Sequence, residues 1–200
     1  MESFNPDLIL LIVFVCAIPI LIVFLKKSSA MFSELALHYN GTVFKPYLGI
    51  AFGVELPFGE HPVIFDPYGQ VVTRRKDNRR MRSSLVWQMP KPFGPQAISI
   101  ERSGFGIKIS ALALAKKIRT NDTIFDQEFD VICRDEAEAL QFLTTQLREL
   151  LMAKREILYA LEIEDGHLIV RHRIVLRDSE QSRHFIDEGI DLLSRMKGGF

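Results

Sequence analysis

The hydrophobic positions of this chain form three successive patterns. Residues 8–25 are all apolar, residues 42–119 hold short β-rich runs separated by Gly and Pro, and residues 125–196 combine two-residue alternation with helical spacing. These patterns are typical of a membrane-spanning helix, of an antiparallel meander, and of strands mixed with amphipathic helices, respectively. We therefore expect a membrane anchor followed by one α+β domain.

The anchor is predicted at Leu8–Leu25, after a short tail of residues 1–7. As a helix, this run would extend about 27 Å at ~1.5 Å per residue, close to the ~30 Å hydrocarbon core of a bilayer. Asp7 precedes the run and Lys26-Lys27 follow it. Since positive charge favours the cytoplasmic side, we predict a single-pass protein of the cell membrane, with its N-terminus outside and its large C-terminal part in the cytoplasm.

A secretory signal peptide is the alternative interpretation of the same run, because Ser28-Ser29-Ala30 offers small residues for cleavage after Ala30. Signal peptides begin with basic residues and carry an apolar region of roughly 7–15 residues. Here the first residues include Glu2 and Asp7, and the apolar run is longer. The pattern therefore favours a retained span.

The residues after the span predict a helix and then a series of strands. Helical spacing followed by the stop signal Asn40-Gly41 indicates a juxtamembrane helix within residues 26–41. The α+β domain is expected at residues 42–197, before a tail of residues 198–200. Its first strands are predicted at Gly49–Leu56, His61–Asp66, Val71–Arg75, Ser84–Met89, Ala97–Arg102 and Phe105–Ser110. Ser103-Gly104 suggests a tight hairpin between the last two; Ala111–Ile118 fits a short helix or a continued strand.

The next segment predicts one strand and one helix. Phe125–Cys133 alternates as a strand, with Phe125, Gln127, Phe129, Val131 and Cys133 on one face. Asp135 and Glu138 form a capping box, which starts a helix that reaches about Lys154. Its apolar stripe consists of Leu140, Leu143, Leu147, Leu150 and Leu151.

The C-terminal segment predicts a hairpin and a final helix. Asp165-Gly166 separates the predicted strands Leu158–Glu164 and His167–Leu176 by the strongest short hairpin signal in the chain. Asp178 then caps a helix with Gln181 at its third position; the buried face is expected to hold Phe185, Ile186, Ile190, Leu193 and Met196. The order β-α-β-β-α after a meander indicates an α+β fold, with helices packed on a largely antiparallel sheet.

A family resemblance is carried by residues 123–131, Thr-Ile-Phe-Asp-Gln-Glu-Phe-Asp-Val, together with Asp135, Ala139, Leu143 and the Asp165-Gly166 hairpin. This pattern resembles uncharacterised bacterial membrane-anchored proteins, in which a hydrophobic N-terminal segment precedes an α+β domain with a Phe-Asp-x-x-Phe core strand. The resemblance covers residues 123–196. It implies a bacterial membrane-anchored protein and supplies no functional residue.

Composition excludes some functions. The chain has 25 Lys and Arg against 25 Asp and Glu, so no net charge recruits nucleic acid, which is a disfavoured partner. Cys16 lies in the predicted span and Cys133 in the domain, so no disulfide is expected.

Candidate metal and catalytic residues are scattered. Asp126, Glu128 and Asp130 share one face of the predicted strand, but their spacing does not match a Ca²⁺ loop, so a solvated face is favoured. His167 and His172 fall on opposite faces of theirs, and His38, His61 and His184 stand apart. No nucleotide-binding or Gly-x-Ser-x-Gly motif occurs. We expect no cofactor, no metal and no catalytic residue.

One basic run is more distinctive than these scattered residues. Residues 74–82 contain a single acid, Asp77, and six cations: Arg74, Arg75, Lys76, Arg79, Arg80 and Arg82. A solvated hairpin tip explains it, but a membrane-tethered domain also holds such a run near anionic lipid. We therefore expect a binding or scaffold module at the cytoplasmic membrane face, which meets anionic lipid or a protein partner. A membrane-tethered enzyme whose active site forms only in three dimensions is the alternative.

Overall fold

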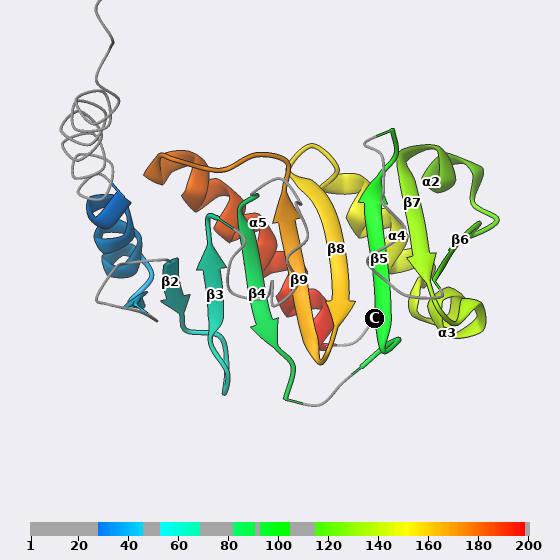
Figure 1. Cartoon of the computed structure of the whole chain (residues 1–200), viewed down its shortest axis with the longest axis horizontal. Helices are drawn as coiled ribbons and strands as arrows, with labels where there is room; N and C mark the ends of the chain where they lie inside the picture. Colours follow the sequence, from blue (N-terminus) through cyan, green and yellow to red (C-terminus); the bar gives the residue numbers. More distant parts are fainter. Residues whose placement is uncertain (1–27, 46–52, 69–81, 91–92, 105–114, 199–200) are drawn as a thin grey trace, which may run out of the picture.

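The strands of this chain join into one antiparallel sheet (Figure 1). The computed structural model describes residues 28–45, 53–68, 82–90, 93–104 and 115–198, and the sheet has nine strands within these ranges. The strands are β1 (Thr42–Phe44), β2 (Gly53–Leu56), β3 (Val63–Asp66), β4 (Ser84–Gln88), β5 (Ala97–Arg102), β6 (Lys116–Ile118), β7 (Phe129–Cys133), β8 (Leu158–Glu164) and β9 (His167–His172). The helices are α2 (Thr123–Glu128), α3 (Glu136–Phe142), α4 (Thr145–Ala153) and α5 (Ser179–Gly198), and residues 28–38 are also helical. The predicted α+β class is confirmed.

The order of strands across the sheet is β1-β2-β3-β4-β9-β8-β5-β7-β6. The first four strands form the expected meander, but the β8–β9 hairpin lies between β4 and β5. β5 pairs with β8 along one edge and with β7 along the other, and the Ser103 N–H continues the second ladder by donating to the Glu128 carbonyl at 2.8 Å. Because neither edge of β5 is free, the tight hairpin predicted at Ser103-Gly104 is wrong.

Several predicted strands agree with the structure within the described ranges. Ala97–Arg102 and Leu158–Glu164 coincide with β5 and β8, whereas β3, β4 and β9 are shorter than expected. β2 covers the described part of the strand predicted at Gly49–Leu56, and residues 49–52 lie outside the described ranges. Ala111–Ile118 was predicted as either a short helix or a continued strand, and within it residues 116–118 form a strand. The predicted strands Val71–Arg75 and Phe105–Ser110 lie outside the described residues.

The predicted strand Phe125–Cys133 is wrong in its first half, because α2 occupies Thr123–Glu128. The Asp122 carboxylate caps this helix by accepting from the Phe125 N–H at 3.1 Å. A helical turn brings the rings of Phe125 and Phe129 together, stacked with centroids 5.0 Å apart. The Phe-Asp-x-x-Phe sequence therefore spans a helix and the start of β7, rather than forming a core strand.

The single helix predicted from Asp135 to Lys154 is broken into α3 and α4. The Asp135 carboxylate accepts from the Glu138 N–H at 3.0 Å, as the capping box predicts. Leu143 then ends α3, and the Thr144 hydroxyl caps α4 by accepting from the Leu147 N–H at 3.2 Å. A Thr side chain offers the backbone this alternative to a continuous helix.

The C-terminal hairpin and helix follow the sequence closely. Asp165 (φ 50°) and Gly166 (φ 77°) are both left-handed, as a two-residue type I′ turn requires. Asp178 accepts from the Gln181 N–H at 2.8 Å and starts α5. Of the predicted inner face of α5, Ile190 is only partly buried and the others are buried.

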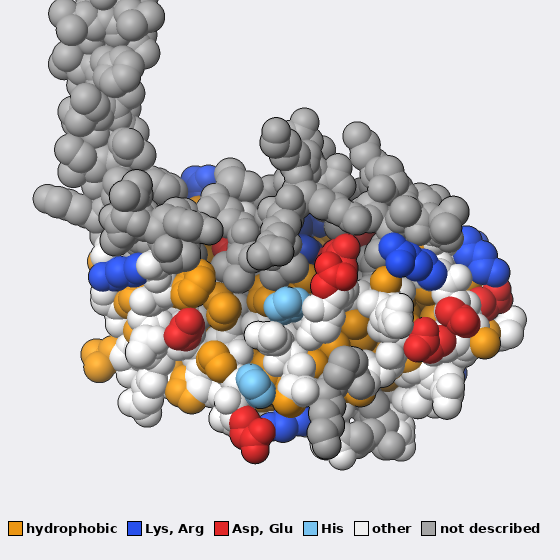
Figure 2. Space-filling model, turned by 60° about the horizontal axis from the view of Figure 1, so that its bottom comes forward, with side chains coloured by type: hydrophobic (Ala, Val, Ile, Leu, Met, Phe, Trp, Pro, Cys, Tyr) orange, Lys and Arg blue, Asp and Glu red, His pale blue; other side chains and the backbone are white. Residues whose placement is uncertain are grey.

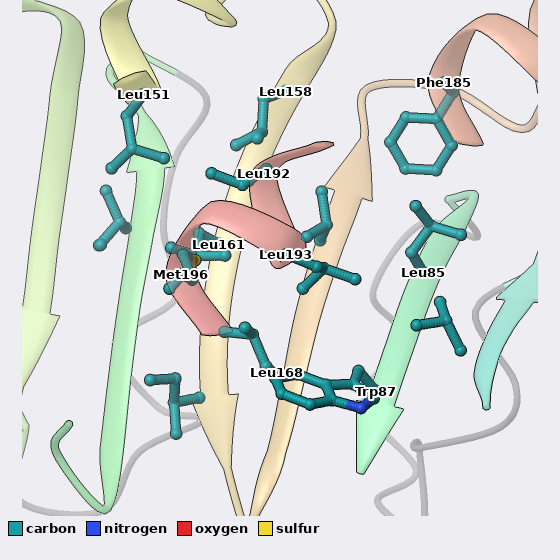
Figure 3. Packing of buried hydrophobic residues seen from close by; sticks show 14 of the residues in the cluster. Leu85, Trp87, Leu151, Leu158, Leu161, Leu168, Phe185, Leu192, Leu193 and Met196 are labelled. Carbon is teal, nitrogen blue, oxygen red and sulfur yellow. The ribbon is translucent and has the colours of Figure 1, made fainter. Parts of the chain in front are cut away.

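The helices cover one face of the sheet, where the core lies (Figure 1). Figure 3 shows side chains of α5, such as Leu192 and Met196, directed at residues of the central strands. α5 comes very close to β4, because a Cβ on Gly189 would stand 2.2 Å from Leu85 Cδ1. Within the described ranges no helix is long and apolar enough to span a membrane; the run Leu8–Leu25 lies outside them.

Candidate functional site

The basic run is described at one residue, Arg82; Arg74, Arg75, Lys76, Arg79 and Arg80 lie outside the described ranges. The Arg82 guanidinium carbon lies 3.6 Å from the centroid of the Tyr159 ring, a cation–π contact. Burial lowers the pKa of Arg82 below its ordinary value, although Tyr159 and Glu101 oppose this shift. Arg82 is thus held against the sheet.

Charged side chains are also buried on the face of the sheet opposite the core helices. Arg171 forms a bidentate ion pair with Glu162, with N–O distances of 3.0 and 2.9 Å. Glu162 stands between the core residues Leu161 and Ile163, so alternation directs it to the other face. Burial by itself lowers the pKa of Arg171, but the carboxylates of Glu162, Glu101 and Asp66 together outweigh burial and leave the pKa raised. Arg171 therefore stays charged, and its pair with Glu162 joins β9 to β8.

Glu101 lies on the same face and accepts from the Ser99 hydroxyl at 2.9 Å. Sequence analysis did not identify this buried polar surface. The Asp165-Gly166 turn could have predicted the Arg171–Glu162 pair. A two-residue turn there sets a register in which Ala160 lies opposite Arg171, and Glu162 is then a diagonal neighbour of Arg171.

The three acids singled out from the sequence do not converge, since α2 holds Asp126 and Glu128 and β7 holds Asp130. Asp126 accepts from the Thr120 hydroxyl and N–H, Glu128 pairs with Arg102 at 3.1 Å, and Asp130 accepts from Ser103 at 3.0 Å. No group of three or more His, Cys, Asp or Glu suited to a metal ion occurs in the described part of the chain. On the face shown in Figure 2, acidic and basic side chains are interspersed.

The two histidines of β9 are not brought together either. His167 and His172 stand at the two ends of β9. The His172 ring contacts Phe185 edge-on at 5.3 Å, and burial lowers its pKa.

The helical segment at residues 28–38 is part of the domain. Phe32 and Leu35 are fully buried, and Met31 and Ala36 are buried beside them. The segment ends as predicted: Asn40 is left-handed (φ 51°) and the Gly41 N–H donates to the Ala36 carbonyl at 2.8 Å.

Polar contacts fasten this segment to α5 and to the end of β3. The Tyr39 hydroxyl donates to the Asp187 carboxylate at 2.7 Å, and Arg183 approaches Glu34 at 3.8 Å. The Ser28 hydroxyl lies 3.1 Å from that of Tyr68. Burial, followed by the hydrogen bond to Asp187, strongly raises the pKa of Tyr39, so it stays protonated.

A cavity of about 300 Å³ opens beside this contact. It is lined by Tyr39, Leu56, Pro57, Asp187, Ile190 and Asp191, and thus by the helical segment's end, the end of β2 and the middle of α5. Asp191 contacts Lys154 at 2.7 Å and Arg195 at 3.0 Å. The cavity combines apolar walls with two carboxylates.

No protein-family model and no curated protein matches the chain. Among solved structures, it is similar to the crystal structure of the mycobacterial trehalose monomycolate transport factor A, TtfA, with a TM-score of 0.50 and 9% identity. The match covers 72% of this chain and 71% of that chain. At this identity the likeness concerns the fold alone.

Proposed function

We propose that this chain is a single-pass membrane protein whose α+β domain is a non-catalytic binding or scaffold module at the cytoplasmic face. One observation carries the proposal: the helical residues 28–38, which follow Lys26-Lys27 in the sequence, are built into the domain core. Because this core element follows Leu25 by so few residues in the sequence, the proposed anchor would hold the domain close to the membrane. Cleavage after Ala30 would cut inside this helical segment, which supports a retained span.

The buried charges support a scaffold rather than a reaction centre. Arg171 forms an ion pair with Glu162, and Lys154 forms ion pairs with Glu188 and Asp191, so these charged groups already neutralise one another. TtfA, whose fold is similar, is named a transport factor, but this likeness transfers no role or substrate to this chain.

Anionic lipid is the proposed surface for the basic run. Because Arg82 is held by Tyr159, the five cations from Arg74 to Arg80 are the proposed contacts. Each basic residue near an anionic membrane surface contributes about 1 kcal/mol of attraction, which salt screens.

Liposome co-sedimentation of a chain beginning at Ser28 tests the lipid contact. Binding should require acidic lipid, weaken as salt rises, and fall when Arg74, Arg75, Arg79 and Arg80 are replaced by Ser. A matched control replaces the exposed Lys45, Arg134, Arg177 and Lys197 by Ser and should retain binding. Equal binding to neutral liposomes, or equal loss in the control, contradicts the lipid contact.

Membrane fractionation and protease accessibility in intact cells test the anchor itself. We expect the full chain in the membrane fraction, with its C-terminal domain protected from external protease and digested after the membrane is opened. Digestion from outside, or a mature chain that begins at Met31, contradicts the proposal.

A further inference from the structure

The cavity between the helical segment and α5 has the chemistry of a site for a long cationic side chain. Leu56, Pro57 and Ile190 supply apolar contacts for an alkyl stem, and Asp187 and Asp191 supply carboxylates for a charged head. Lys and Arg bury their stems against apolar surface while the charge stays paired or solvated. The volume of about 300 Å³ is at the small end of ligand sites, so one side chain fits it better than a large ligand does.

The two carboxylates are not equally engaged. Asp191 already contacts Lys154 and Arg195. Asp187 accepts one hydrogen bond from the neutral Tyr39 hydroxyl, and within the described ranges no cation lies at ion-pair distance from it. A carboxylate has about four acceptor positions, so Asp187, which is exposed, retains capacity for an ammonium or guanidinium.

The position of the cavity indicates where the cation comes from. Tyr39 lies 14 residues beyond Leu25 in the sequence. The connection can therefore extend at most about 46 Å at ~3.3 Å per residue, a distance that an equally long flank of a neighbouring membrane protein can also cover. Cytoplasmic segments beside membrane spans are rich in Lys and Arg.

We infer that this cavity binds a Lys or Arg side chain from the basic cytoplasmic flank of a neighbouring membrane protein. The inference rests on the proposed membrane anchor and deepens it by naming the chemistry of the partner. Asp187 pairs with the charged head, Ile190 and Pro57 contact the stem, and Tyr39 orients the Asp187 carboxylate.

A small-molecule experiment tests the cavity independently of the anchor. The full chain in detergent micelles, labelled at isoleucine methyl groups, is titrated with n-butylguanidinium and, as a neutral match, with n-butylurea. The Ile190 methyl signal should shift saturably with the cation alone, with a dissociation constant of about millimolar. The exposed Ile174 methyl, on the chain after β9, should not shift. Equal shifts from the urea, or no saturable shift, overturn the site.

Two variants of α5 decide whether Asp187 is the contact. Asp187→Asn keeps an acceptor for Tyr39 but removes the charge, and should weaken cation binding about three- to tenfold. Glu180→Gln removes an exposed charge about two turns away and should bind as the unmodified chain does. Unchanged binding by Asp187→Asn, or equal loss in Glu180→Gln, overturns the assignment.

Energy transfer in liposomes tests the partner. The full chain is reconstituted with a single-span peptide whose flank reads Leu-Arg-Arg-Leu or Leu-Ser-Ser-Leu. We expect association with the arginine peptide alone, reduced by Asp187→Asn. Equal association with both peptides overturns the inference about the partner. Failure of the anchor is seen separately, in the protease experiment, and leaves the methyl shifts intact.

Discussion

At the scale of single residues, the Asp165-Gly166 turn decides how the C-terminal hairpin closes. Both residues are left-handed, which Gly adopts freely and Asp tolerates. A Cβ on Gly166 would meet no atom within 4 Å. Any cost of a side chain there therefore comes from the backbone conformation and not from a clash.

Gly166→Val should destabilise the protein by on the order of 1 kcal/mol or more, because a β-branched residue strains a positive φ. Gly166→Asn is the matched variant and should cost less, since Asn tolerates this region. Denaturant unfolding of the full chain in mild detergent measures both. Equal stability of the Val and Asn variants would show that backbone strain is not the cause.

The Arg171–Glu162 pair makes a second prediction at this scale. Arg171→Met should cost about 3 kcal/mol, because it removes the bidentate ion pair of the buried Glu162 carboxylate. Adding Glu162→Gln should recover much of this loss. Arg177→Met, at an exposed position, is the control and should change stability little. A double variant as unstable as Arg171→Met alone would contradict the account.

At the scale of elements, local capping decided where helices begin, and at Thr144 a side-chain hydrogen bond to the backbone separates α3 from α4. The caps at Asp135 and Asp178 were legible from the sequence. The cap at Thr144 was not, because the leucine stripe continues through it and only the packing of two short helices reveals the break. The alternation at Phe125–Glu128 was misleading because one turn of helix buries Phe125 just as a strand would.

The Lys154 contact between α4 and α5 predicts a pH dependence. The hydrogen bond from Lys154 holds the pKa of the Asp191 carboxyl below its ordinary value, although partial burial opposes this. A depressed carboxyl pKa adds stability above the unfolded pKa, and this stability is lost as pH falls through the folded pKa.

Asp191→Asn should therefore cost at most about 1 kcal/mol at pH 7, since the pair is partly exposed. The difference from the unmodified chain should shrink below about pH 4. Thermal unfolding of both proteins between pH 3 and pH 7, at about 0.15 M salt, measures this difference. A difference that stays constant or grows toward low pH would contradict the assignment.

At the scale of the whole molecule, the helical segment at residues 28–38 behaves as part of the domain and not as a spacer. Phe32 and Leu35 are fully buried, and Tyr39 is hydrogen-bonded to α5. The segment itself completes the core.

A chain of residues 28–200 should fold cooperatively without the anchor, and a chain of residues 41–200 should be less stable by several kcal/mol. Removing Phe32 and Leu35 strips large apolar surface from the core, and single large core side chains contribute about 2–5 kcal/mol each. Circular dichroism and denaturant unfolding compare the two. Equal stability would mean that the segment only rests on the domain.

The sequence by itself determined what depends on neighbouring residues: the α+β class, β5 and β8, the Asp165-Gly166 turn and the caps at Asp135 and Asp178. Its apolar run at Leu8–Leu25 and its basic run predict a membrane setting through the same local logic. The tertiary structure alone decided the place of the β8–β9 hairpin between β4 and β5, because strand partners are chosen by packing across the whole sheet. It also brought Tyr39 to Asp187, 148 residues apart, since helix docking depends on surfaces that no local pattern records.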